Sequence, residues 1–277
     1  MLHDLLRSPP ALISALVLVF LVLAAVFAPI VATHPFDAQM LTAANLAPSA
    51  DHWFGPDEFG RDVWSRVVWG TRTSLGVACA SIAFSVTLGL LVGTVAGFFG
   101  GWVDRVLMML TDLTWCFPEI LLAFVVVAIL GPGAGSSVLA IAIAYLAQFA
   151  RLARTEIRGL KGQVFIEASR SLGAGPLHLM FRRLLPNALP TVAVSAMLAL
   201  GAAILLEATL GFFGMGAQPP VPSWGSMMSA GSVQLFNGPW VIVFPGLFVA
   251  ASVLAINIFG DVLLKRIDVR ERKREGV

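Results

Sequence analysis

Four acidic residues interrupt long apolar stretches of the sequence: Asp112, Glu119, Glu207 and Asp261. A charge in the hydrocarbon of a membrane costs about 2.5–3.5 kcal/mol on insertion scales, so such residues face other helices or water. Asp112 and Asp261 lie near the ends of their stretches, where Arg105 and Lys265 or Arg266 are available as partners. Glu119, after the helix-kinking Pro118, and Glu207 lie deeper. Either could contact an amine or cation of a substrate, or hydrogen-bond to a neighbouring helix.

No set of residues with catalytic or metal-binding spacing accompanies these acids. The four histidines, His3, His34, His52 and His178, are far apart in the sequence and outside the apolar stretches, so no metal site is expected. None of the three lysines stands in the G-x-x-x-x-G-K-[ST] pattern that binds phosphates. Cys79 and Cys116 lie within apolar stretches and predict no disulfide. We therefore expect neither an enzyme nor a bound cofactor.

The composition indicates the environment in which the acidic residues lie. Apolar residues make up 58% of the 277 and charged residues only 12%, about half of what a water-soluble surface carries. The mean hydropathy of +0.87 agrees. The composition predicts an integral membrane protein and excludes disordered, collagen-like and nucleic-acid-binding chains.

Apolar runs of about 20 residues, enough to cross about 30 Å of hydrocarbon as a helix, occur six times. They cover residues 11–33, 73–99, 104–130, 137–154, 187–213 and 239–264. The first is too long for the apolar part of a signal peptide, so we interpret it as an anchor helix. The fold class predicted is an all-α polytopic membrane protein. A terminus of residues 1–10, an outer loop of 34–72, a core of 73–264 that holds the other five spans, and a tail of 265–277 complete the organisation.

The basic residues predict the orientation. If both termini are cytoplasmic, fifteen of the 18 basic residues lie on the cytoplasmic side, and only Arg61, Arg66 and Arg72 lie outside. The outer segment 54–72 contains Asp62 and Arg66 four residues apart, which predicts a helix along the membrane surface. That helix could anchor the protein at the interface or dock a partner. Within the second run, Gly89, Gly93 and Gly97 predict close packing against another helix.

The long basic segment 155–186 has a pattern of its own. Residues 155–172 lack proline and predict a helix that prolongs the fourth span. Gly173 and Gly175 stop it, and Pro176 suits the first position of a second helix. Leu177, Met180, Phe181 and Leu184 would then share one face. Such a helix could insert into a groove of a partner protein or lie on lipid headgroups.

Three motifs carry a resemblance to a known family. Glu167-Ala168-Ser169, then Gly173, then Leu184-Leu185-Pro186, resembles the EAA loop of ABC-type importer permeases, with Ser169 in place of alanine and Arg183 in place of isoleucine. The stretches 54–66 (FGPDEFGRDVWSR) and 207–225 (EATLGFFGMGAQPPVPSWG) are similar to motifs of the dipeptide, oligopeptide and nickel permease group, as is Phe259-Gly260-Asp261. The order of the motifs fits the predicted topology over nearly the whole chain.

The resemblance implies the fold, partners and mechanism of a type I ABC importer. It implies a second homologous permease, two cytoplasmic ATPase subunits that bind ATP and Mg, and an external substrate-binding protein. Residues 177–185 would form the coupling helix, and closure of the ATPase dimer would reopen the path outward. The coupling residues would be Glu167, Ala168, Ser169, Gly173, Leu177, Met180, Phe181, Leu184, Leu185 and Pro186. The location implied is the bacterial inner membrane.

The cargo stays open at this point. The leading hypothesis is di- or oligopeptides, because no histidine or cysteine of the spans has the spacing of a metal-ligand set. The same machine could import nickel or a metal–chelator complex, glutathione, opines or short sugars. A more remote alternative is a stand-alone ion-coupled carrier, in which Glu119 and Glu207 would bind protons or cations. Six spans without a visible inverted repeat argue against the carrier. Glu119 and Glu207 are the candidates for the substrate path.

Overall fold

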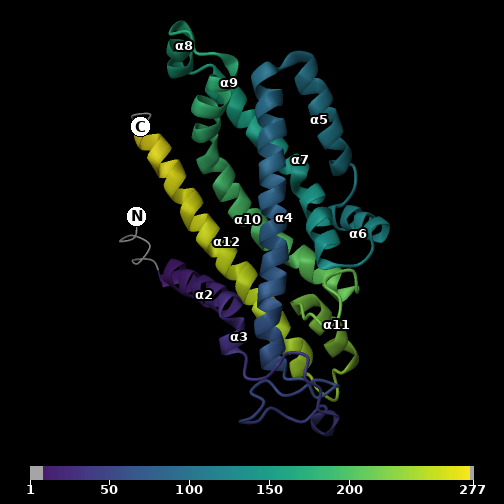
Figure 1. The fold of residues 1–277 in the computed structure, drawn as a ribbon. Coiled ribbons are helices and arrows are strands. Elements are labelled where there is room, and N and C mark those ends of the chain that lie inside the picture. Colours follow the sequence, from purple (N-terminus) through teal and green to yellow (C-terminus); the bar gives the residue numbers. More distant parts are fainter. Residues whose placement is uncertain (1–8, 275–277) are drawn as a thin grey trace.

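A computed structural model of the chain describes residues 9–274 and shows an elongated helical bundle (Figure 1). The longer helices are α2 (Pro9–Val26), α4 (Val63–Phe99), α5 (Gly101–Trp115), α6 (Glu119–Leu130), α7 (Ala134–Lys161), α10 (Leu185–Phe212), α11 (Trp224–Val233) and α12 (Trp240–Arg274). Within the part of the chain that the structure describes, five helices are long and apolar enough to cross a membrane, or six if the bent pair of α5 and α6 is one span. Within residues 9–274 the only β pairing is an isolated bridge between Pro56 and Asp62.

α4 runs through the centre of the bundle for 37 residues and starts earlier than expected (Figure 1). Asp62 is its N-cap and accepts a hydrogen bond from Ser65 N at 2.8 Å. The prediction of a helix along the membrane surface is therefore wrong, because residues 63–72 form the first turns of α4. Val63 and Val67 are buried against Met227 and Val241, so this stretch is fixed by packing inside the bundle.

The glycines of α4 let α7 approach its backbone, which confirms their predicted packing role. A Cβ atom added to Gly89 would lie 2.6 Å from Phe149 Cβ, and one added to Gly93 would collide with the carbonyl of Ala150. At Gly97 the nearest atom would be Arg154 O at 2.9 Å. Within a membrane the hydrophobic effect does not hold helices together, so the van der Waals contacts of such close packing stabilise the helix pair.

The third apolar run, 104–130, is not one straight helix. α5 and α6 meet at an angle of 90°, because Pro118 lacks the N–H of a helical residue and adopts an extended conformation as the N-cap of α6. The expected partner of Asp112 was also wrong. Its carboxylate pairs with Arg151 of α7 at 2.6 Å, and Asp104 pairs with Arg154. The predicted partners of Asp261, at 265 and 266, lie outside the described side chains.

The remaining spans differ from the apolar runs mainly at their ends. The first run, 11–33, forms α2 and, after a break at Phe27, the short α3 (Ala28–Val31). The last helix continues past 264 to Arg274. α2 packs beside α12, and α11 fills the space between α10 and α12. Ser223 and Ser226 form a capping box at the start of α11.

The outer loop 32–62 folds over the end of the bundle that carries the start of α4 (Figure 1). Asp57 in this loop accepts a hydrogen bond from Arg61 Nε at 2.7 Å and also contacts Arg66. His34 and His52, expected to be apart, lie with ring centroids 4.8 Å from each other. The chain therefore brings together two histidines that are 18 positions apart in the sequence.

Candidate coupling site

The segment between α7 and α10 consists of short helices at one end of the bundle. α7 ends at Lys161, and Gly162 and Gln163 separate it from α8 (Val164–Ser171). The single helix expected over 155–172 is therefore divided in two. Lys161 Nζ donates a hydrogen bond to Phe98 O at 2.5 Å, which satisfies a carbonyl at the end of α4. Glu167, Ala168 and Ser169 lie on α8, which stands out from the bundle (Figure 1).

Gly173 forms the turn after α8. Its φ of +86° lies in the left-handed region, which costs other residues about 1–2 kcal/mol. Gly173 N donates to Arg170 O at 2.9 Å, and Ala174 N donates to Ser169 O at 3.1 Å. These two bonds are the Schellman pattern that closes a helix C-terminus. The glycine therefore sets the direction in which the chain leaves α8.

The next helix has a different buried face from the one expected. α9 (Pro176–His178) begins at Pro176 and continues as a π-helix over Leu179–Leu184 into α10. The four residues predicted to share one face do not share one environment: Met180 and Leu184 are buried, but Leu177 is 70% and Phe181 44% exposed. Leu179, which the helical pattern left out, is buried instead. The wider π-turn shifts which side chains align, and the sequence contains no separate indication of it.

A small apolar core holds this helix on the bundle. It contains Leu179, Met180 and Leu184 together with one residue from each neighbouring helix: Phe98 of α4, Ile157 of α7, Ile166 of α8 and Ala188 of α10. Because four helices contribute, a displacement of the short helices would disturb their packing against α4, α7 and α10. The arrangement is suited to mechanical coupling between this end and the spans.

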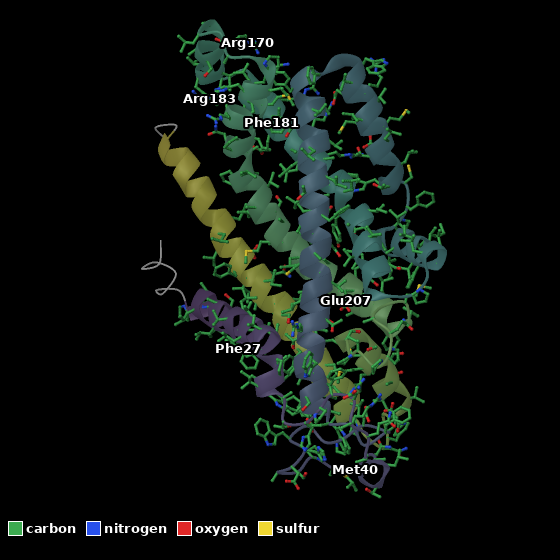
Figure 2. The ribbon with its side chains drawn as sticks, viewed as in Figure 1. Phe27, Met40, Arg170, Phe181, Arg183 and Glu207 are labelled. Atoms are coloured by element: carbon green, nitrogen blue, oxygen red, sulfur yellow. The ribbon has the colours of Figure 1, made fainter. Side chains whose placement is uncertain are left out.

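The outer surface of the same segment is apolar and basic. Arg170, Phe181 and Arg183 gather at this end of the bundle (Figure 2). Val164, Phe165 and Leu172 are also exposed. A depression of about 400 Å³ is lined by Ser169, Leu172, Gly173, Ala174, Gly175, His178 and Arg183. Glu167, Ala168 and Pro186 are exposed and Leu185 is half-buried. Exposed apolar side chains rimmed by charges are typical of a surface that binds another protein.

The two candidate path residues lie in different environments. Glu207 on α10 is 1% exposed and accepts a hydrogen bond from Ser74 of α4, whose Oγ also accepts from Trp224 N at 3.2 Å. It lies inside the bundle (Figure 2), and within the described residues its Oε2 has no hydrogen-bond partner. Glu119 is exposed at the start of α6, beside the Tyr145 hydroxyl.

Two family models and several curated proteins are similar to this chain. The family model described as "Binding-protein-dependent transport system inner membrane component" matches residues 89–273, and that of the N-terminal TM domain of oligopeptide transport permease C matches residues 1–48. The dipeptide transport system permease protein DppC of Alkalihalophilus pseudofirmus is 37% identical over 96% of this chain and 87% of its own length. The glutathione transport system permease protein GsiD of Escherichia coli O157:H7 is 39% identical over 95% and 87%.

The fold has a solved counterpart. Inward-facing structures of the MetNI methionine ABC transporter match 73% of this chain and 95% of theirs, with a TM-score of 0.58 and 22% identity. This likeness confirms the type I importer fold of the membrane domain. With the family match over 89–273 and the relatives above 35% identity, the chain belongs to the family of binding-protein-dependent transport system inner membrane components, the multi-pass permease subunits of ABC importers.

Proposed function

We propose that this chain is one of two membrane subunits of an ATP-driven, binding-protein-dependent importer of short peptides. The observation that carries the proposal is the coupling segment, residues 164–185, whose buried side packs against α4, α7 and α10 and whose outer side is apolar and basic. A second homologous permease would complete the path. Two ATPase subunits would bind ATP and Mg, and one of them would dock on the outer side of the coupling segment of each permease.

In this proposal the ATPases act through the small apolar core. Leu177 and Phe181 project outward and would enter a groove of the ATPase, whereas Met180 and Leu184 anchor the segment. Glu167, Ala168 and Ser169 on α8 would flank the contact, and Gly173 would aim it. Leu185 and Pro186 would pass the movement to α10. This end of the bundle and both termini would face the cytoplasm, as the basic residues predict.

The names of the relatives support a short peptide as the cargo. The names of two relatives specify dipeptide and glutathione transport, and glutathione is itself a tripeptide. We therefore infer a short peptide. Glu119 would face the path or the second permease, because an exposed carboxylate within an apolar span would be costly against lipid. Glu207, enclosed by α4, α10 and α11, would serve packing between these helices.

The direct test is uptake by the reconstituted complex. The proteoliposomes contain this chain, its co-purified permease and ATPases, and the binding protein. They are expected to transport a labelled dipeptide or glutathione only when ATP is present on the side of the membrane that carries the ATPase subunits. Nickel added in excess is expected to leave peptide uptake unchanged. Uptake by the chain alone without ATP would contradict the proposal and support a carrier.

Substitutions at the neighbouring residues Phe181 and Met180 distinguish an effect on ATPase docking from an effect on folding. Phe181→Ala removes an exposed ring, so we expect loss of ATPase binding with unchanged thermal stability. Met180→Ala removes a buried side chain and should lower stability by about 2–5 kcal/mol. Co-purification of the ATPase and thermal unfolding of each variant measure the two effects. Full ATPase binding by Phe181→Ala would show that the docking surface lies elsewhere.

A further inference from the structure

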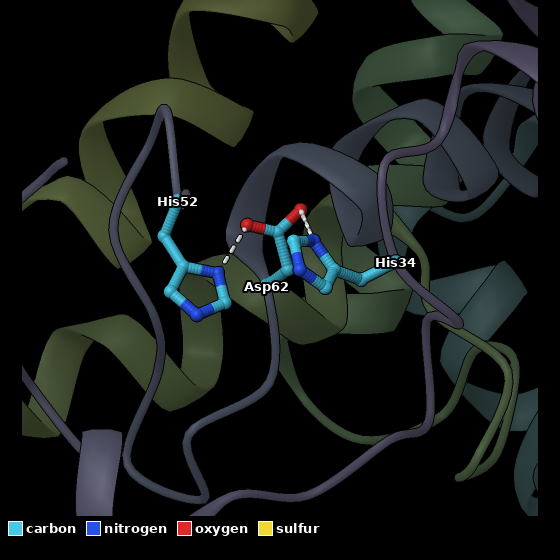
Figure 3. Close-up of side chains that lie close together, drawn as sticks. All are labelled: His34, His52 and Asp62. Atoms are coloured by element: carbon cyan, nitrogen blue, oxygen red, sulfur yellow. Dashed lines mark hydrogen bonds and ion pairs between the residues drawn. The ribbon is translucent and has the colours of Figure 1, made fainter. Parts of the chain in front are cut away.

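Two histidines and an aspartate meet at the end of the bundle opposite the coupling site (Figure 3). His34 follows α3, His52 lies in the outer loop, and Asp62 caps α4. His52 Nδ1 is 2.9 Å from Asp62 Oδ1, and His34 Nδ1 is 3.9 Å from Asp62 Oδ2. One ligand atom from each residue falls within 4.8 Å of the others. The cluster therefore unites three segments of the outer loop.

Asp62 is buried but has no permanently charged partner among the described residues. It is 2% exposed, and the adjacent Arg61 and Arg66 both contact Asp57 instead. Buried carboxylates are normally paired with a cation or bound to a metal. The groups facing Asp62 that can become positive are the imidazoles of His34 and His52. A bound divalent cation would supply the missing charge.

The two carboxylate oxygens have different neighbours. Oδ2 accepts hydrogen bonds from Ser65 N at 2.8 Å, from Ser65 Oγ at 2.6 Å and from Thr33 Oγ1 at 3.2 Å. Among the described residues, Oδ1 has a hydrogen bond only with His52 Nδ1. Oδ1 is thus available as a metal ligand while Oδ2 keeps the carboxylate oriented, which is how outer partners support the ligands of a metal site.

We propose that His34 Nδ1, His52 Nδ1 and Asp62 Oδ1 form a site for a divalent transition metal of the zinc class. Imidazole and carboxylate ligands suit zinc, nickel and copper. Ligands of a tetrahedral zinc lie about 3.3 Å apart. His52 Nδ1 and Asp62 Oδ1 are 2.9 Å apart, and the ligand atoms of the three residues lie within 4.8 Å of one another. Both rings would bind as neutral imidazoles with the proton on Nε2. His34 is 40% exposed, so a water molecule can reach the fourth position.

The site would act as a cross-link at the rim of the bundle. It would join the chain after α3, the middle of the outer loop and the start of α4, which are otherwise held by hydrogen bonds such as His34 N to Ser65 Oγ at 3.0 Å. A metal that binds the folded state stabilises it in proportion to its occupancy. The site lies in the outer loop, so its metal binding does not depend on which cargo the protein transports.

Metal titration of the full-length chain tests the site. The chain is purified in lipid nanodiscs with a tag that lacks histidine and is stripped with EDTA. Titration with Co²⁺ is expected to give the visible absorption of a four-coordinate site at one ion per chain, displaced by Zn²⁺. His34→Ala and His52→Ala are each expected to weaken Zn²⁺ binding by about tenfold or more and to abolish the rise in melting temperature with Zn²⁺.

His178→Ala is the matched control, because His178 is exposed at the coupling end. It is expected to bind Zn²⁺ as the wild type does. His34→Gln serves as a second variant, since it keeps a polar side chain at this position. A thermal unfolding transition measured in EDTA shows that each metal-free variant is folded. Absence of stoichiometric binding, or equal Zn²⁺ affinity in the wild type, His34→Ala and His34→Gln, would overturn the proposal.

Discussion

At the scale of single residues, backbone conformation and burial decide what each motif position does. Gly173 is required by its φ of +86°, not by crowding, because nothing lies within 4 Å of a Cβ added there. Gly175, two positions later, has a φ of −71° and equally open space. The two glycines therefore differ in one physical property, and that property can be tested.

We predict that Gly173→Pro abolishes ATP-driven uptake while the protein still inserts in the membrane. Proline fixes φ near −65°, so the turn after α8 cannot form and the coupling helix is misdirected. Gly173→Ala should reduce coupling less, through a strain of about 1 kcal/mol. Gly175→Ala is the control and should transport normally. ATP-dependent uptake in proteoliposomes checks all three, and normal uptake by Gly173→Pro would refute the role of this turn.

A second prediction concerns the two carboxylates. Glu207→Gln keeps the size of the buried side chain and its contact with Ser74, so we expect a small effect on uptake. Glu119→Gln removes a charge that is exposed at the bend and should lower uptake more. Uptake rates, normalised to the amount of assembled complex, measure the difference. Complete loss of uptake in Glu207→Gln with intact assembly would place Glu207 in the substrate path.

At the scale of elements, the contact between α4 and α7 organises the bundle. Small residues bring the two backbones together, so that the polar ends of α5 and α7 can also pair through Asp104, Arg154 and Arg158. At the bend between α5 and α6, Arg151 of α7 lies over the ring of Trp115, 3.9 Å from its centroid. The long helix α4 consequently links the outer loop at one end to the coupling site at the other.

We predict that Gly93→Ala destabilises the protein strongly. An added methyl group would collide with the carbonyl of Ala150, and overpacking typically costs about 1–3 kcal/mol. Gly76→Ala on the same helix is the control. Nothing lies within 4 Å of a Cβ there, so the change should be neutral or stabilising, because alanine favours helix. Thermal unfolding in detergent compares the two, and equal melting temperatures would contradict close α4–α7 packing.

At the scale of the whole molecule, the two ends of the bundle differ in chemistry. The coupling end carries exposed arginines, whereas in the outer loop Arg61 pairs with Asp57 and Glu58. The outer loop packs onto α12 as well, where Phe54 stacks on Phe244 with ring centroids 3.7 Å apart. The asymmetry predicts how the molecule is oriented in its membrane.

We predict that Ser49→Cys reacts with a membrane-impermeant thiol reagent in intact cells, and that Ser171→Cys reacts only after permeabilisation. Both residues are exposed, at opposite ends of the bundle. The background is a variant with Cys79 and Cys116 replaced by serine. The reverse labelling pattern would show that the coupling segment faces outward and would refute the proposed orientation.

The membrane character, the approximate spans and the family can all be predicted from the amino-acid sequence. Hydropathy depends on composition within a window of about 20 residues, and motifs such as 207–225 are local. Gly173 was also recognised as a turn, because helix ends have a local pattern. The close packing of Gly89, Gly93 and Gly97 was predicted from their spacing alone.

Contacts between residues far apart in the sequence depend on how the helices pack and cannot be predicted from local patterns. The burial of Leu179 and the exposure of Leu177 follow from a π-helix that must seat against Phe98 and Ile157. The pairing of Asp112 with Arg151 and the enclosure of Glu207 depend on how helices rotate against one another. His34 and His52 converge because the outer loop folds back on the N-cap of α4. Local sequence cannot specify these contacts, since they arise from packing between segments far apart in the chain.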